Sequence, residues 1–297
     1  MIGVPTSAGA FAPGQEQAPA ALRAAGLIEL LRDAGVEAHD HGDSEIWRWR
    51  PDRENRRAQN SRRVAEIVRD TAERVGDAVG AGEATLVLGG DCTVGIGTVA
   101  GHVASGESVA LVYFDTHADL NVPESVREGT LDWMGMAHML GEDGAVRDLV
   151  EVGAGVPLLR PEQVLLFAWG PEQATPHELG AIERLPIEVI PVDEVRTDPS
   201  VAAARALESP GVQADRLLVH FDVDVVDFTD TPLSENVGRN EGLAYDDAAK
   251  ALDVLLRSPR LAGITITELN PAHVEDGAGS IERLTRDLVR GLAGSDG

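Results

Sequence analysis

A short run of candidate metal ligands, Asp115-Thr-His117-Ala-Asp119, directly follows the apolar segment 108–114. That segment is rich in β-branched and aromatic residues, which is typical of a buried strand. In an extended chain, residues two apart project to the same side, so Asp115, His117 and Asp119 can converge on one point. Carboxylate and imidazole groups are ligands of hard and borderline metal ions. Taken alone, the run fits an acidic turn that binds no metal equally well.

Three further apolar segments also end in acidic or thiol side chains. The segments and the residues that follow them are 84–88 with Asp91 and Cys92, 216–221 with Asp222 and Asp224, and 261–267 with Glu268. Carboxylates crowded at one place repel one another at neutral pH unless a cation lies among them. Each motif alone also fits a loop carboxylate, a cap or a tight turn, so the prediction of a metal site depends on all four together.

Helical patterns separate these strands along the chain. We predict helices at 19–31, 61–79, 93–104, 176–185, 199–207, 245–257 and 279–293, and further strands at 2–5, 36–40, 164–168 and 187–191. Such alternation predicts a three-layer α/β/α fold with a mainly parallel central sheet, in which sites lie outside the carboxyl ends of the strands. No internal repeat or linker divides the sequence, so we expect one domain over residues 1–297.

The composition narrows the class of protein. Asp and Glu number 50 against 25 Lys and Arg, and the net charge of −25 argues against nucleic acid and anionic membranes as partners. A cationic ligand fits this charge. No apolar run approaches the roughly 20 residues that span a bilayer, and no secretory signal is visible. A single cysteine, Cys92, excludes an intrachain disulfide framework. We therefore expect a cytoplasmic protein.

The four motifs, in this order and spacing, resemble those of the arginase–agmatinase family of binuclear manganese ureohydrolases. The matching segments are Gly89-Gly90-Asp91, Asp115-x-His117-x-Asp119, Asp222-x-Asp224-x-x-Asp227 and Glu268-x-Asn270-Pro271. The similarity extends over nearly the whole chain. It implies a single ureohydrolase-like domain with an arginase–deacetylase-like fold, which commonly assembles into homo-trimers or hexamers.

The resemblance also implies two Mn²⁺ ions per chain and a ligand set for each. The first ion would be held at the positions of Cys92, Asp115, Asp119 and Asp222, and the second at those of Asp115, His117, Asp222 and Asp224. A metal-bound hydroxide would attack the guanidinium carbon of the substrate. Asp119 would relay the proton to the leaving amine, and Glu268 would accept hydrogen bonds from the guanidinium. The products would be urea and an amine.

Cys92 departs from the family pattern, because a histidine follows Gly-Gly-Asp in the family signature. A thiolate binds metal but favours softer ions such as zinc over manganese. A neutral cysteine would instead be a small buried residue that weakens one metal subsite. Some family members that act on hydroxylated arginine are similar in carrying cysteine here, so the change does not imply loss of activity.

The substrate-binding residues depart from the pattern as well. Asp132 stands where arginases carry a proton-shuttle histidine, and it is a candidate catalytic or substrate-pairing residue, with His138 as a nearby alternative. Asn121 matches a residue that contacts the substrate carboxylate, and Glu172 is expected where an aspartate binds the α-amino group. Arginine, agmatine, hydroxyarginine, guanidino acids and larger guanidino compounds therefore all remain candidate substrates.

Two other functions are compatible with the sequence. One is a single-metal hydrolase of an amide or formimino bond, which Cys92 favours and which Glu268 and the complete third motif disfavour. The other is a non-catalytic family member that binds a cationic ligand or serves as a subunit of an assembly. The intact acidic motifs are difficult to explain without metal, so the guanidino hydrolase is the preferred interpretation.

Overall fold

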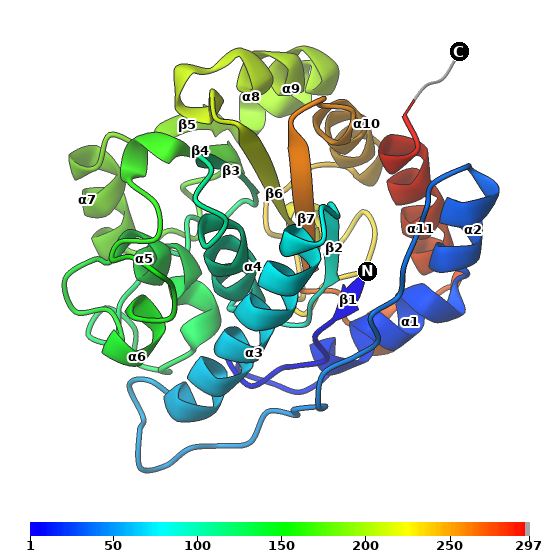
Figure 1. The fold of residues 1–297 in the computed structure, drawn as a ribbon. Helices are drawn as coiled ribbons and strands as arrows, with labels where there is room; N and C mark the ends of the chain where they lie inside the picture. Colours follow the sequence, from blue (N-terminus) through cyan, green and yellow to red (C-terminus); the bar gives the residue numbers. More distant parts are fainter. Residues whose placement is uncertain (295–297) are drawn as a thin grey trace.

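A seven-stranded parallel sheet forms the centre of the computed structural model, which describes residues 1–294 (Figure 1). From edge to edge, the strands are β1 (Ile2–Gly3), β2 (Thr85–Leu88), β7 (Leu261–Thr267), β6 (Arg216–Asp222), β3 (Val109–Phe114), β4 (Val164–Trp169) and β5 (Glu188–Pro191). Each neighbouring pair runs parallel. The predicted mainly parallel sheet is confirmed.

Helices cover both faces of the sheet and complete three layers (Figure 1). One face carries α3 (Ser61–Gly80), α4 (Val94–Val103), α5 (Gly135–Leu140), α6 (Arg147–Val150) and α7 (Pro176–Arg184). The other carries α1 (Ala18–Ala24), α2 (Leu27–Asp33), α8 (Val192–Thr197), α9 (Pro199–Glu208), α10 (Tyr245–Leu256) and α11 (Gly279–Leu292). Within residues 1–294, no helix is both long enough and apolar enough to cross a bilayer.

Each central strand is mostly a run of apolar residues because both faces of the sheet are buried. In β3, alternate residues pack into different cores: Val109, Leu111 and Tyr113 lie under α3 to α7. Ala110, Val112 and Phe114 lie on the opposite side. The first polar residues after each central strand therefore lie at the carboxyl edge of the sheet.

Two predicted elements differ from the structure. The helix predicted at 19–31 is two helices, α1 and α2, because Gly26 adopts a left-handed conformation with φ of 83° between them. The strand predicted at 36–40 is an irregular segment, and the chain that follows it forms only a single bridge to β1, between Gly3 and Asp43. The short helices α5, α6 and α8 were not predicted, since each has too few residues to show a helical period.

Helix α4 lies close to α3 because glycines line the contact. A Cβ at Gly97 would lie 2.6 Å from Thr71 Cβ and 2.7 Å from the Val68 carbonyl oxygen, and a Cβ at Gly101 would lie 2.6 Å from Val75 Cγ1. This close approach fixes the start of α4, and hence Cys92, against the carboxyl edge of the sheet.

We predict that Gly97→Ala lowers the free energy of unfolding by about 1–3 kcal/mol, because the added methyl group overpacks the α3–α4 contact. Gly180→Ala is the matched control, since Gly180 lies within α7 and its Cβ would meet nothing within 4 Å. That substitution should stabilise the protein by about 0.5–1 kcal/mol. Urea denaturation measures both changes, and equal effects at the two positions would contradict the packing described.

Candidate metal centre

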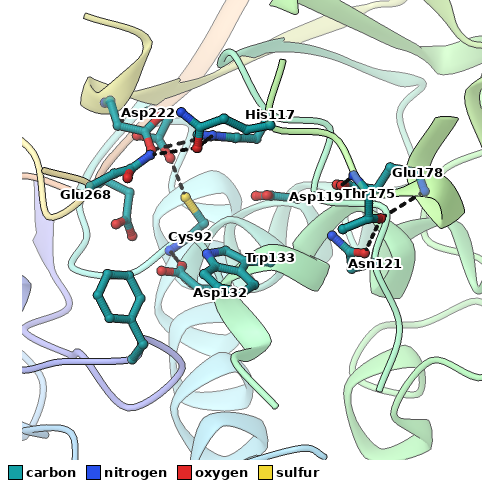
Figure 2. Close-up of a pocket in the computed structure, with 14 residues that line it drawn as sticks. Cys92, His117, Asp119, Asn121, Asp132, Trp133, Thr175, Glu178, Asp222 and Glu268 are labelled. Carbon is teal, nitrogen blue, oxygen red and sulfur yellow. Dashed lines mark hydrogen bonds and ion pairs between the residues drawn. The ribbon is translucent and has the colours of Figure 1, made fainter. Parts of the chain in front are cut away.

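The side chains predicted to bind metal lie together because their strands are neighbours. The order β2, β7, β6, β3 is continuous within the sheet, and parallel pairing brings the carboxyl ends of these strands to one edge. Figure 2 shows Cys92, His117, Asp119, Asp222 and Glu268 around one cavity at this edge. The cavity has a volume of about 220 Å³.

The first group of ligand atoms comes from Asp115, His117 and Asp224. His117 Nδ1 lies 3.1 Å from Asp115 Oδ1 and 3.4 Å from Asp224 Oδ2. Asp115 Oδ2 and Asp224 Oδ1 are buried and have no hydrogen-bond partner within residues 1–294. Because buried polar atoms in native proteins are nearly always paired, a bound cation is the natural partner for these two oxygens.

The second group is built around Cys92. Its Sγ lies 2.7 Å from Asp222 Oδ2, and the ligand atoms of Cys92, Asp115 and Asp119 lie within 4.8 Å of one another. The hydroxyl group of Tyr113 donates a hydrogen bond to Asp119 Oδ2 and so fixes that carboxylate. Asp115 contributes to both groups, as a ligand that bridges two metal ions would.

Burial and mutual repulsion disfavour the charged form of most of these carboxyl groups; Asp224 is the exception, because the neighbouring His117 lowers its pKa. Burial, together with the charge of Asp224, raises the pKa of Asp115 to about 7. Burial is also the main cause of the raised pKa values of Asp119, Asp132, Asp222 and Glu268. A divalent cation opposes this effect because it stabilises carboxylates in their charged form. The electrostatics and the unpaired oxygens therefore both fit a metal site.

Asp132 and Glu268 face the same cavity beside Cys92, and the ligand atoms of these three residues lie within 4.8 Å of one another. The backbone N–H of Cys92 donates to Asp132 Oδ1 at 2.5 Å. Gln15 Nε2 donates to Glu268 Oε2 at 2.6 Å, while Glu268 Oε1 is buried without a partner in the described part of the chain. Two adjacent carboxyl groups suit a planar guanidinium, which carries N–H donors along its edge.

His138, the alternative to Asp132, lies elsewhere. It is buried within α5, where its Nδ1 lies 2.5 Å from the carbonyl oxygen of Met134. Burial lowers its pKa to about 4. His138 does not belong to the cavity wall formed by residues 1–294, so Asp132 is the residue of this pair that can reach a substrate.

Asn121 lines the cavity, but Glu172 does not. Asn121 Oδ1 accepts hydrogen bonds from the hydroxyl groups of Ser125 and Thr175, at 2.8 and 2.7 Å, which leaves its N–H groups as donors. Glu172 is exposed, outside the cavity wall. Thr175 and Glu178 form the wall instead, and they cap the start of α7 through reciprocal hydrogen bonds.

Several residues of the wall carry no sequence signal. Phe11 and Trp133 lie at one side of the cavity with ring centroids 6.1 Å apart, and the amides of Gln173 and Asn236 complete the wall. Trp133 and Gln173 adjoin the predicted site residues Asp132 and Glu172 in the sequence. The others come from loops with no regular pattern, and their place in the site follows from tertiary folding alone.

Known proteins resemble this chain both in sequence and in fold. The sequence model of the arginase family matches residues 1–292. An arginase of Bacillus caldovelox is 29% identical over 276 residues, which cover 91% of this chain and 90% of that protein. The crystal structure of an arginase from Bacillus subtilis is 25% identical and superposes with a TM-score of 0.85 over 99% of this chain and 98% of that one. A formimidoylglutamase structure from the same species, 18% identical with a TM-score of 0.75 over 98% of this chain and 84% of that one, shares the fold.

We predict that metal-free protein loses stability as the pH rises from 3.8 to about 7. The folded state favours protonated Asp115, whose pKa is raised between these two values, so this contribution is present at low pH and lost as the group ionises. Manganese chloride should remove the loss. Thermal unfolding midpoints across this pH range, in chelator and in manganese, measure the effect, with Asp115→Asn as the variant that lacks this titration. Identical profiles in chelator and manganese would contradict the prediction.

Proposed function

The chain belongs to the arginase family, and from this premise we propose that it is a hydrolase that cleaves a C–N bond of a guanidino compound to give urea and an amine. One observation carries the proposal. Asp115, Asp224 and Glu268 each hold a buried carboxylate oxygen without a partner in residues 1–294. Asp224 and Glu268 line a single cavity, and Asp115 lies in one ligand group with Asp224 and His117. The candidate substrates are arginine, agmatine, hydroxyarginine and guanidino acids.

We assign metal binding to a set of six side chains at the ends of β3 and β6 and in the turn between β2 and α4. These are Cys92, Asp115, His117, Asp119, Asp222 and Asp224. Carboxylate and imidazole groups suit manganese, and the family resemblance favours two Mn²⁺ ions, with the Cys92 subsite altered. Divalent ions held there would supply a water nucleophile of lowered pKa at neutral pH.

The chain's own residues orient the substrate and move the proton. Asp119 lies where a carboxylate can accept a proton from the attacking water and pass it to the leaving amine. Glu268 accepts guanidinium hydrogen bonds through its unpaired Oε1, and Asp132 offers a second acceptor beside it. Asn121 donates from its amide to the far end of the substrate.

The charge of the cavity supports a cationic substrate. Of the residues within 1–294 that line it, Asp119, Asp132, Glu178, Asp222, Asp224 and Glu268 are acidic, and none is Lys or Arg. The net charge of −25 extends this negative potential to the whole protein and favours the approach of cations. A guanidinium fits both the charge and the paired acceptors at the base of the cavity.

A single-metal hydrolase of an amide or formimino bond is the second candidate. The observation that favours it is the Cys92 thiol in a group of otherwise hard ligands, because a thiol makes the two subsites unequal. The similarity to formimidoylglutamase concerns the fold alone and does not choose between the two reactions. Metal content separates them, since two ions per chain exclude the single-metal enzyme.

We also propose that residues 1–297 act as one ureohydrolase-like domain in a cytoplasmic homo-oligomer. One continuous sheet, with strands drawn from residue 2 to residue 267, supports a single domain. The family resemblance suggests a trimer or hexamer, which light scattering of the purified protein tests directly.

We predict that manganese-loaded protein releases urea from at least one compound in a panel of agmatine, arginine, hydroxyarginine and guanidino acids. Glu268→Gln should lower kcat/KM by about 10²–10³-fold, because the neutral amide cannot stabilise the cationic guanidinium to the same extent. Glu37→Gln, on a side chain that is 90% exposed, is the control and should match the wild type. Urea is measured with metal content determined by mass spectrometry on the same samples.

Two results would contradict the proposal. Absence of urea from every compound, with two ions bound per chain, would refute a guanidino hydrolase and favour the non-catalytic interpretation. Unchanged turnover in Asp224→Asn would refute the ligand assignment, because Asp224 supplies one of the unpaired oxygens of the His117 group.

A further inference from the structure

A chain of polar contacts extends from Cys92 into the core beneath the metal centre. Cys92 Sγ lies 3.3 Å from Thr267 Oγ1, and Thr267 Oγ1 lies 3.1 Å from His220 Nε2. Thr267 and His220 are 0% and 1% exposed, on the face of the sheet that α4 covers. Burial of polar groups costs free energy unless they are hydrogen-bonded. The contacts among these three side chains therefore offset the cost of burying them.

The hydrogen-bond direction follows from the environment of His220. Its Nδ1 is buried without a partner in residues 1–294, and it faces Gly95, where a Cβ would lie only 2.6 Å away. Because orphaned buried N–H groups are rare, we infer that Nδ1 carries the lone pair and Nε2 the hydrogen. The Nε2–H group then donates to Thr267 Oγ1, which also accepts from the Cys92 thiol at 3.3 Å; once a metal replaces the thiol hydrogen, the Thr267 hydroxyl can donate to the sulfur instead.

The same imidazole also supports a second ligand. His220 stacks on Tyr113 with ring centroids 4.3 Å apart and an interplanar angle of 7°. Tyr113 in turn donates its hydroxyl hydrogen to Asp119 Oδ2. Cys92 and Asp119 belong to the same group of ligand atoms, so the layer formed by His220, Thr267 and Tyr113 supports one subsite of the centre.

Metal-bound sulfur carries no hydrogen, so in a loaded site the Thr267 hydroxyl is the donor that lies beside it. The sulfur lies near Asp222 and Asp115, whose charges oppose a free thiolate, and Asp115 Oδ2 is one of the unpaired oxygens. A cation at this point offsets the repulsion, and the Thr267 hydroxyl satisfies the remaining acceptor capacity of the sulfur. Metal binding would replace the Sγ–H bond with a sulfur–metal bond and release the proton to solvent.

We propose that Thr267 and His220 are positioning residues that orient the Cys92 sulfur as a metal ligand, so that the subsite of Cys92, Asp115, Asp119 and Asp222 prefers thiophilic ions such as zinc or cobalt over manganese. The preference follows from the softness of the thiolate. The inference rests on the proposed metal centre but does not depend on hydrolysis of a guanidino compound, so the two can fail separately.

Cobalt(II) titration of the metal-free full-length protein tests the inference by absorption spectroscopy. The wild type should show sulfur-to-cobalt charge transfer in the near ultraviolet, and Cys92→Ser should lose it. Thr267→Val should weaken cobalt binding at this subsite about 10–100-fold and shift the band, because the donor to sulfur is lost. Thr267→Ser keeps the hydroxyl group, so it should retain both the cobalt affinity and the band of the wild type. Thr265→Val is the matched control, since this buried threonine of the same strand donates instead to Thr98 Oγ1 at 2.9 Å.

The outcomes separate the inference from the metal centre. Bound cobalt without the sulfur band in the wild type would overturn the inference and leave a metal centre in place, whereas no bound cobalt would overturn both. Wild-type behaviour of a folded Thr267→Val would remove the role of Thr267.

A comparison with Cys92→His remains decisive if Thr267→Val does not fold. Zinc binds most sites more tightly than manganese, so the informative quantity is the ratio of the zinc and manganese affinities in each protein. That ratio should fall at least about tenfold in Cys92→His, because imidazole is a harder ligand than thiolate. An unchanged ratio would overturn the inference.

Discussion

Repulsion among buried carboxylates is the constraint on which this structure depends. Parallel pairing of β2, β7, β6 and β3 forces their acidic carboxyl ends together, and burial raises the free energy of every charge placed there. Asp119 and Glu268 even adopt left-handed backbone conformations, with φ of 50° and 64°, at this edge. Such an arrangement is tolerated when bound cations compensate it, so the fold and the proposed chemistry share one physical cause.

The two halves of the centre are supported differently. His117, 22% exposed, borders the cavity and contacts Gln173 at its rim. Cys92 is buried and contacts a polar side chain of the sheet. The glycine-rich helix α4 packs closely against the same part of the sheet. A small thiol suits the second environment because little space separates the start of α4 from β6 and β7.

The sequence predicts the parts of this protein that depend on local pattern. Continuous apolar segments identify the central strands, and the residues that follow them identify the ligand cluster, because parallel strands end at a common edge. Local pattern does not reveal that Gly26 divides a helix, that Thr175 and Glu178 rather than Glu172 reach the cavity, or that His220 and Thr267 lie beneath Cys92. These features arise from contacts between residues distant in sequence, whose geometry is set only when the sheet has formed.

Anomalous X-ray diffraction from crystals of the metal-loaded protein tests the central claim most directly, because it locates bound ions independently of activity. The account predicts two peaks inside the cavity, one beside Cys92 Sγ and one beside His117 Nδ1, with Asp115 in contact with both. Data collected on either side of each metal's absorption edge would identify the ion at each peak. A cavity without a peak, with Asp115 Oδ2 and Asp224 Oδ1 still unpaired, would contradict the account.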